Sequence, residues 1–138
     1  MKKKGLLIML IITGVILFEC IGANEVFAAI NSESWKNEGH VDDRDIHARS
    51  YIYSTTADSS TYSDVYDTSV YCKVDATYGA VNLQNYDVYT DHKIRDGYSS
   101  ATAPFSCPSG YQSVSVSADH YASKNGSTWS GPTYKSYP

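Results

Sequence analysis

The chain has 138 residues, a length that suits one domain of ordinary size. Its 11 basic and 15 acidic residues give a net charge of −4, so charge alone does not attract the chain to nucleic acid or anionic lipid. The three cysteines are an odd count, whereas a secreted domain usually pairs its thiols.

The N-terminal segment, residues 1–28, has the three parts of a secretory signal peptide. A lysine-rich start precedes an apolar run from Leu6 to Phe18, and a more polar stretch then ends on small residues. The apolar run has 13 residues, fewer than the roughly 18–20 that span a bilayer. We therefore expect cleavage after about Ala28 or Ala29, a secreted protein, and no stable membrane insertion of the mature chain.

Cys20 raises the alternative of a lipoprotein signal, in which this cysteine becomes the acylated first residue. Leu17 fits that pattern, but Phe18 and Glu19 stand where lipid-attachment sites have small residues. A lipoprotein anchored at Cys20 is therefore the disfavoured interpretation.

Removal of residues 1–28 leaves 110 residues, a charge of −5 and two cysteines, Cys72 and Cys107. Outside the cytosol these two thiols predict a disulfide. The chain-entropy model gives such a crosslink about 3.5–4 kcal/mol of stabilisation.

The composition after residue 28 favours β-structure. Leu83 is its only leucine, and it keeps eight valines, four isoleucines and all 13 tyrosines. Such β-branched and tyrosyl side chains fit a pleated, half-buried surface, while abundant Ser and Thr weaken helices. We predict an all-β domain over residues 48–138, a small antiparallel β-sandwich or barrel-like domain of about six to eight short strands.

Residues 29–47 are acidic and have few large apolar side chains, which predicts a lead-in segment rather than a core strand. The segment also holds the densest set of possible metal ligands. The spacing matches no zinc or EF-hand pattern and Arg44 would repel a cation, so a solvated acidic segment is preferred. No cofactor is expected, and the weak metal candidates are His40, Asp42, Asp43, Asp45 and His47.

Four later segments alternate apolar and polar residues with the period of a half-buried strand. The side chains expected to face inward are Ser50 and Ile52 in 48–55; Val70, Cys72, Val74, Ala76 and Tyr78 in 70–78; Tyr86, Val88, Thr90, His92 and Ile94 in 86–94; and Val114, Val116, Ala118 and His120 in 114–121.

Asn125-Gly126 is the most specific turn signal and predicts a hairpin with a type I′ turn. The second arm of this hairpin is expected to be interrupted at Gly131-Pro132, because proline cannot donate to a sheet ladder.

The dipeptides Asp91-His92 and Asp119-His120 raise the possibility of Ser/His/Asp hydrolysis. No Gly-x-Ser-x-Gly motif marks a nucleophile. The Asp and His of a strand dipeptide also face opposite sides of the sheet, so they cannot pair with each other. We therefore expect structural histidines and no catalytic residue.

The remaining signal is a set of outward aromatic side chains. Rigid amphipathic rings give contact area at little entropy cost, which suits a binding surface. An equally good alternative is a second sheet face on which the tyrosines pack against each other. The candidate surface comprises Tyr51, Tyr53, Tyr71, Tyr89, Tyr121, Trp129 and Tyr134.

These observations favour a secreted, non-catalytic interaction protein of the cell envelope, with a cell-wall glycan or a surface protein as partner and no nucleic acid. A secreted bacteriocin-like antibacterial protein is the alternative, which the small size and the Tyr/Ser-rich β composition permit. A small secreted hydrolase is the second alternative.

Overall fold

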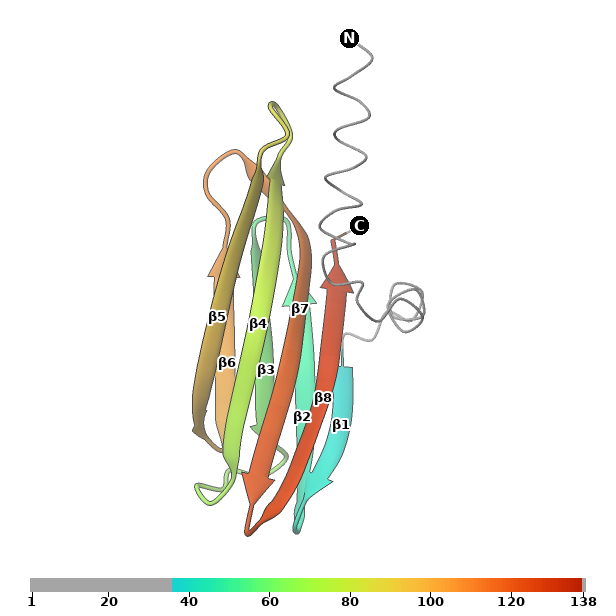
Figure 1. The fold of residues 1–138 in the computed structure, drawn as a ribbon, viewed down its shortest axis with the longest axis vertical. Helices are drawn as coiled ribbons and strands as arrows, with labels where there is room; N and C mark the ends of the chain where they lie inside the picture. Colours follow the sequence, from blue (N-terminus) through green and yellow to red (C-terminus); the bar gives the residue numbers. More distant parts are fainter. Residues whose placement is uncertain (1–35, 138) are drawn as a thin grey trace. The chain divides into compact units, whose positions relative to one another are not determined.

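The computed structural model describes residues 36–137, which fold into eight antiparallel β-strands without a helix (Figure 1). This confirms the predicted all-β class. The strands are β1 (Lys36–Val41), β2 (Arg44–Ile52), β3 (Thr56–Ser63), β4 (Tyr71–Asn82), β5 (Val88–Tyr98), β6 (Ser100–Ser106), β7 (Tyr111–Lys124) and β8 (Ser127–Ser136).

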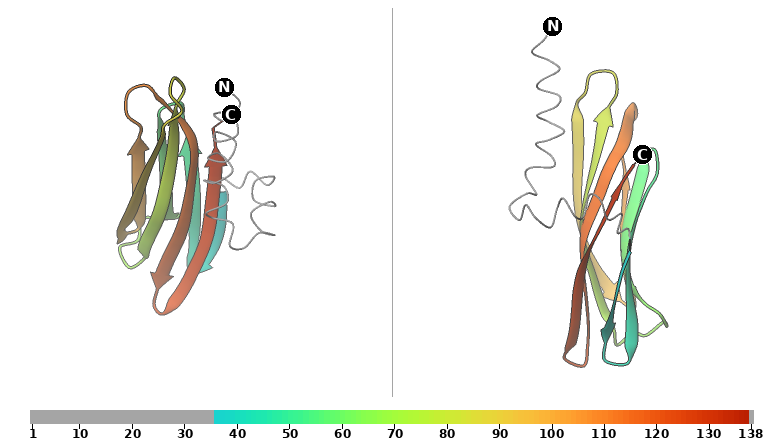
Figure 2. Two further views of the ribbon diagram at one scale, coloured as in Figure 1. Left: turned by 45° about the horizontal axis from the view of Figure 1, so that its top comes forward. Right: turned by 90° about the vertical axis from the view of Figure 1, so that its right-hand side faces the viewer.

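The strands form two four-stranded sheets that pack as a β-sandwich, as the layers in Figure 2 show. The first sheet has the order β1-β2-β3-β6 and the second has the order β5-β4-β7-β8. β1 lies against β8 at one edge, and β5 lies against β6 at the other. The first sheet therefore packs on the inner face of the second sheet, whose central strands are β4 and β7.

The predicted faces of β2 and β4 are confirmed. All five inward residues expected in 70–78 are at most 1 % exposed, and Ser50 is fully buried. The core between the sheets is made mainly of alanine and valine side chains, with Tyr78 and Phe105 as its large aromatic members. Because alanine and valine are small, hydroxyl groups such as those of Ser50 and Thr61 also lie in the core.

The predicted face of 86–94 is wrong. In β5 the side chains of Tyr89, Asp91 and Lys93 are the less exposed set, whereas Val88 and Ile94 are 43 % and 47 % exposed. β5 is an edge strand, so its inward side chains reach the rim of the sandwich. There the Lys93 stem can cover apolar surface while its ammonium donates to Pro104 O at 2.6 Å.

A β-bulge corrects the prediction for Val114. The register between β4 and β7 shifts between Gly79 and Ala80, which pair with Ser115 and Ser113. The extra residue, Val114, is 41 % exposed and Ser113 is buried instead. Beyond the bulge, Val116, Ala118 and His120 face inward as predicted.

Part of the predicted acidic lead-in is sheet. Residues 36–47 form β1 and the first part of β2, and the few apolar side chains of this segment are enough to fix its face. Val41 and Ile46 are both fully buried in the core. The described domain therefore begins before residue 48.

The predicted hairpin at Asn125-Gly126 is confirmed. Both residues have positive φ, 49° and 82°, as a type I′ turn requires, and Lys124 pairs with Ser127 across it. β8 is not interrupted at Gly131-Pro132, however. It is an edge strand, where a missing N–H removes no ladder hydrogen bond.

The predicted disulfide is absent, and Cys72 and Cys107 are free thiols. Cys72 is the second residue of β4. Cys107 lies near the other end of this strand: its Sγ is 3.2 Å from the carbonyl oxygen of Tyr111, and Tyr111 pairs with Asn82, the last residue of β4. From Cys72 to Asn82 the strand extends about 33 Å. A disulfide needs Cα atoms within about 7 Å, so the fold keeps the two thiols apart.

The predicted signal peptide and Cys20 lie outside the described residues. Within residues 36–137, no helix has the length and apolar character of a bilayer span.

Candidate functional site

The structure separates the seven aromatic residues of the predicted surface into three locations. Tyr51 and Tyr53 are exposed in and just after β2, on the first sheet. Tyr71, Tyr121 and Tyr134 lie on strands of the second sheet and are half-buried.

Tyr89 and Trp129 pack against the core, so the outward orientation predicted for Tyr89 is wrong. The Tyr89 ring contacts Tyr78 and Tyr111 edge to face, with centroids 6.5 and 6.1 Å apart. The Trp129 indole covers Gly39, where β1 meets β8. These two rings stabilise the sandwich edges.

Three tyrosines form a row across the outer face of the second sheet, which we call the tyrosine row: Tyr98 on β5, Tyr71 on β4 and Tyr121 on β7. The ring centroid of Tyr71 lies 6.1 Å from the ring centroid of Tyr98 and 6.3 Å from that of Tyr121, and both ring pairs are edge to face. Tyr98 is 66 % exposed. The antiparallel register dictates the row, since Tyr71 pairs directly with Tyr98 and is diagonal to Tyr121.

The hydroxyl group of Tyr71, the middle member of the tyrosine row, stays protonated at neutral pH. Partial burial raises the pKa of Tyr71, and the neighbouring Asp96 carboxylate raises it further. A protonated phenol both donates and accepts hydrogen bonds. The row therefore combines apolar ring area with hydroxyl groups of both hydrogen-bonding types.

Sequence reasoning missed Tyr98 because Asp96-Gly97 is typical of a turn. β5 instead continues through Gly97, and the chain turns at Ser99, which has φ of 67°. A Cβ on Gly97 would lie 2.6 Å from the Ser100 carbonyl oxygen, so the glycine permits the close approach at this corner. Asp96 and Tyr98 are two residues apart and so face the same side of a strand. This alternation is the signal that could have placed Tyr98 beside Tyr71 on the outer face.

His92 lies on the same outer face and pairs with a carboxylate from the neighbouring strand. Its Nε2 lies 2.6 Å from Asp75 Oδ1, and its side chain is 53 % exposed. Asp91 instead contacts Lys93. The expectation that Asp91 and His92 do not pair with each other is therefore confirmed.

His120 is buried between the sheets, where hydroxyl groups satisfy both ring nitrogens. Thr61 Oγ1 donates to Lys73 O at 2.9 Å, so at 2.8 Å it accepts from His120 Nδ1–H. The neutral ring then accepts at Nε2 from Thr133 Oγ1, 2.7 Å away. Desolvation lowers the pKa of His120 to about 4, so the imidazole is neutral at neutral pH.

The five weak metal candidates are drawn into separate contacts. His40 pairs with Asp45 at 2.8 Å, His47 approaches Glu38 at 3.5 Å, and Asp42 accepts from Asn125. Within 36–137 no group of three or more His, Cys, Asp or Glu side chains has the geometry of a metal site.

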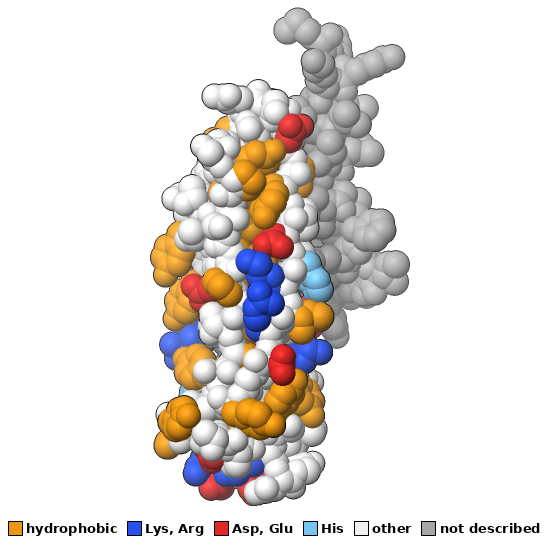
Figure 3. All heavy atoms as spheres, turned by 90° about the vertical axis from the view of Figure 1, so that its left-hand side faces the viewer, with side chains coloured by type: hydrophobic (Ala, Val, Ile, Leu, Met, Phe, Trp, Pro, Cys, Tyr) orange, Lys and Arg blue, Asp and Glu red, His pale blue; other side chains and the backbone are white. Residues whose placement is uncertain are grey.

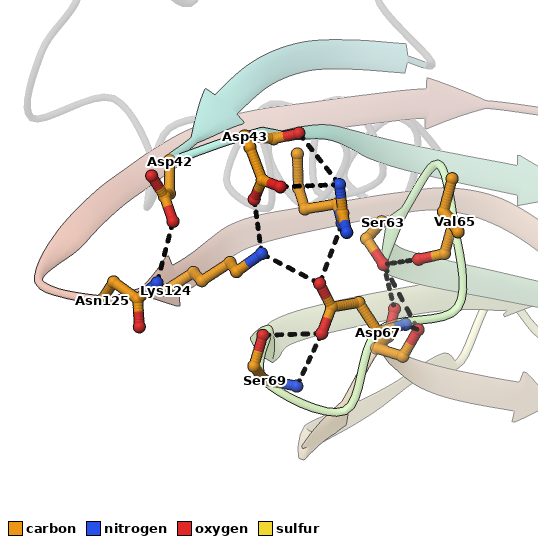
Figure 4. A network of polar contacts seen from close by, with 10 residues as sticks. Asp42, Asp43, Ser63, Val65, Asp67, Ser69, Lys124 and Asn125 are labelled. Carbon is orange, nitrogen blue, oxygen red and sulfur yellow. Dashed lines mark hydrogen bonds and ion pairs between the residues drawn. The ribbon is translucent and has the colours of Figure 1, made fainter.

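Asp43 belongs to a network of charges at the end of the sandwich that holds the β7–β8 hairpin (Figure 4). The ammonium of Lys124, 8 % exposed, contacts both Asp43 and Asp67. Arg44 Nε donates to Asp67 Oδ2 at 2.8 Å. Hydrogen bonds from Ser69 and from Lys124 lower the pKa of Asp67 far below its usual range, so this network is ionised.

No family model, curated protein or solved structure matches the chain. The function is therefore inferred from the chemistry of the surface.

Proposed function

We propose that this protein is a non-catalytic binding protein that acts outside the cell and engages a neutral glycan of the cell envelope. The tyrosine row is the observation that carries the proposal. Three rings that span adjacent strands offer apolar area to the faces of sugar rings, and their hydroxyls can bond sugar hydroxyls.

The charges around the row disfavour an anionic ligand. Asp75, Asp96 and Asp119 lie on the outward phase of the second sheet, where Lys73 is the neighbouring lysine. This excess of carboxylates opposes the binding of polyanions such as nucleic acid.

The contacts of the histidines support a non-catalytic role. Both nitrogens of His120 are occupied by core hydroxyls. His92 and Asp75 pair on an exposed sheet face, where the His92 side chain is 53 % exposed.

Retention of the protein on insoluble peptidoglycan and on a neutral polysaccharide tests the proposal. Tyr98→Ala should weaken retention at least about fivefold, because the ring is exposed and its loss removes stacking area. Tyr53→Ala is the matched control, since Tyr53 is 56 % exposed on the other sheet, and should leave retention unchanged.

Added salt should leave the retention of the wild type unchanged, since the proposed contact is uncharged. Equal retention of the Tyr98 and Tyr53 variants, or no retention of the wild type on any glycan, would refute the proposal.

A further inference from the structure

One end of the sandwich carries almost no charge. It consists of the β2–β3 loop (53–55), the β4–β5 loop (83–87) and the β6–β7 loop (107–110). Backbone hydrogen bonds hold this end together: Ser113 donates to Ser54 O at 2.8 Å and Cys107 donates to Thr55 O at 3.0 Å. Asp87 is the only Asp, Glu, Lys or Arg in the three loops.

Exposed apolar side chains gather at this end. We call Leu83, Tyr86, Val88 and Val114 the apolar tip; they are 59 %, 52 %, 43 % and 41 % exposed. The β4–β5 loop projects beyond the other loops in Figure 1. On the face seen in Figure 3, hydrophobic side chains occur along the whole length, and the upper part shows no basic side chain. Leu83, the only leucine after residue 28, thus lies in solvent in a protein whose core lacks leucine.

Hydrogen bonds within the chain brace the β4–β5 loop. Tyr86 N donates to Asn82 O at 2.8 Å, and Asn82 N donates to Asp87 O at 2.9 Å. The Asn82 side chain accepts from Gln84 N at 2.9 Å. Tyr86 has φ of 64°, which a bulky residue adopts only where its surroundings enforce it. The loop therefore presents Leu83 and Tyr86 from a hydrogen-bonded turn.

The bulge in β7 adds to the same surface. Without the extra residue, the strand alternation would direct Val114 into the core, as the sequence pattern predicts. The register shift turns Val114 outward instead, next to the β4 segment whose Val81 pairs with Val88. Two local departures from regular geometry, at Tyr86 and at the bulge, thus place apolar side chains in solvent.

We propose that the apolar tip docks into the interfacial region of an uncharged, zwitterionic lipid surface. A bilayer interface accepts isolated apolar side chains from a projecting loop without a matching pocket, and it favours tyrosine, whose ring is apolar and whose hydroxyl stays hydrated. A protein partner is usually fixed in register by charged pairs at the rim. These loops have only Asp87, whose carboxylate accepts from Asn85 at 2.7 Å.

The charge of the chain selects the kind of lipid. Docking on anionic lipid relies on clustered Lys and Arg, and these residues are absent from the three loops. The chain is also acidic overall. Docking at the tip leaves the tyrosine row free, because Tyr71 lies at the opposite end of β4, roughly 35 Å away.

Flotation with phosphatidylcholine vesicles tests the proposal on the full chain. The wild type should bind, and Leu83→Ser should lower its partition about tenfold or more. Tyr86→Asn should also lower the partition. Asparagine is chosen because it tolerates the positive φ at this position. Val65→Ser, at a loop of the opposite end where Val65 is 53 % exposed, is the matched control and should bind as the wild type does.

Hydrogen exchange locates the contact independently of residues 1–28, which all variants share. Slower exchange of 82–88 in the presence of vesicles is the expected result. Equal partition of Leu83→Ser and Val65→Ser, binding only to vesicles that contain phosphatidylglycerol, or unchanged exchange at 82–88 would overturn the proposal. So would vesicle-independent capture of an envelope protein that Leu83→Ser abolishes.

Discussion

Thr133 Oγ1 lies 2.7 Å from His120 Nε2 and 2.6 Å from Ser50 Oγ, so one hydroxyl joins a histidine of the second sheet to a serine of the first. Ser59 continues the series, 2.7 Å from Ser50. Because Thr133 donates to the neutral ring, it must accept from Ser50, and Ser50 must accept from Ser59. The series therefore has one direction, and every buried hydroxyl in it has a partner.

Thr133→Val should destabilise the fold by about 1–3 kcal/mol, because it leaves His120 Nε2 without a donor and the Ser50 hydroxyl without its acceptor in the core. Thr133→Ser keeps the hydroxyl and should recover most of the loss. Urea midpoints of the two variants measure the difference, and equal midpoints would show that the hydroxyl contributes nothing.

Stability should fall as the pH drops from about 6.5 towards 4. The pKa of His120 is lowered to about 4 in the fold and returns to about 6.5 in the unfolded chain, so the unfolded chain binds the extra proton in this window. The His120 contribution to this loss should reach about 3 kcal/mol near pH 4, and protonation of Asp67, whose pKa is lowered in the fold, should continue the loss at lower pH. Urea titrations at several pH values measure it, and His120→Gln should flatten the profile between pH 6.5 and 4.

Asp67→Asn should destabilise the fold clearly more than an exposed Asp→Asn change, because it removes the carboxylate that accepts from Arg44 and Lys124 and leaves Asp43 as the remaining carboxylate on Lys124. Asp45→Asn is the matched control, since Asp45 is 53 % exposed and contacts only the exposed His40. Its loss should be below about 1 kcal/mol. Comparable unfolding midpoints for the two variants would contradict a structural role for the Lys124 network.

Gly39→Ala should destabilise the edge between β1 and β8, because a Cβ would overlap Nε1 and Cδ1 of the Trp129 indole. We expect about 1–3 kcal/mol, the usual range for overpacking. Gly79→Ala is the control, since its Cβ would meet Ser115 Oγ at an ordinary 3.6 Å. Thermal unfolding of both variants measures the effect. A loss of stability for Gly39→Ala no larger than that for Gly79→Ala would contradict the predicted overlap with Trp129.

The two cysteines should react at different rates with a thiol reagent. Cys72 is fully buried, and burial raises the pKa of its thiol to about 11, so it should stay unreactive until the protein unfolds. Cys107 is partly exposed and should be labelled first. Peptide mapping of the labelled native protein measures the order, and a Cys72–Cys107 crosslinked peptide would contradict the fold.

The sequence predicted the elements whose faces one strong pattern determines. Residues 70–78 combine five inward side chains with charged ones between them, and Asn125-Gly126 leaves the backbone one suitable turn. The predicted face of β5 was wrong because Val88 and Ile94 are more hydrophobic than Tyr89 and Lys93. At the rim of the sandwich, however, the amphipathic side chains of Tyr89 and Lys93 can face inward. The inward orientation predicted for Val114 was wrong because no residue near it in the sequence indicates a β-bulge.

The cysteine pair and the tyrosine row depend on information that local patterns lack. Compartment chemistry and an even count predicted a disulfide, but only the strand register shows that Cys72 and Cys107 occupy opposite ends of β4. The same register brings Tyr98 to Tyr71 and Tyr121 from segments far apart in the chain. Tyr71 and Tyr121 were correctly assigned to the outward phase because each lies in a strand with clear alternation.

The order of strands in the two sheets also constrains how the chain folds. β3 pairs with β6 and β4 pairs with β7, so the first sheet gains its fourth strand, and the second sheet its third, only after the chain has passed through the other sheet. Such non-local pairing makes folding slow, because loop closure precedes most of the stabilising contacts. A nascent chain that ends before β6 can form only the β1-β2-β3 meander and the β4–β5 hairpin, and the second sheet is complete only when β8 has emerged from the ribosome.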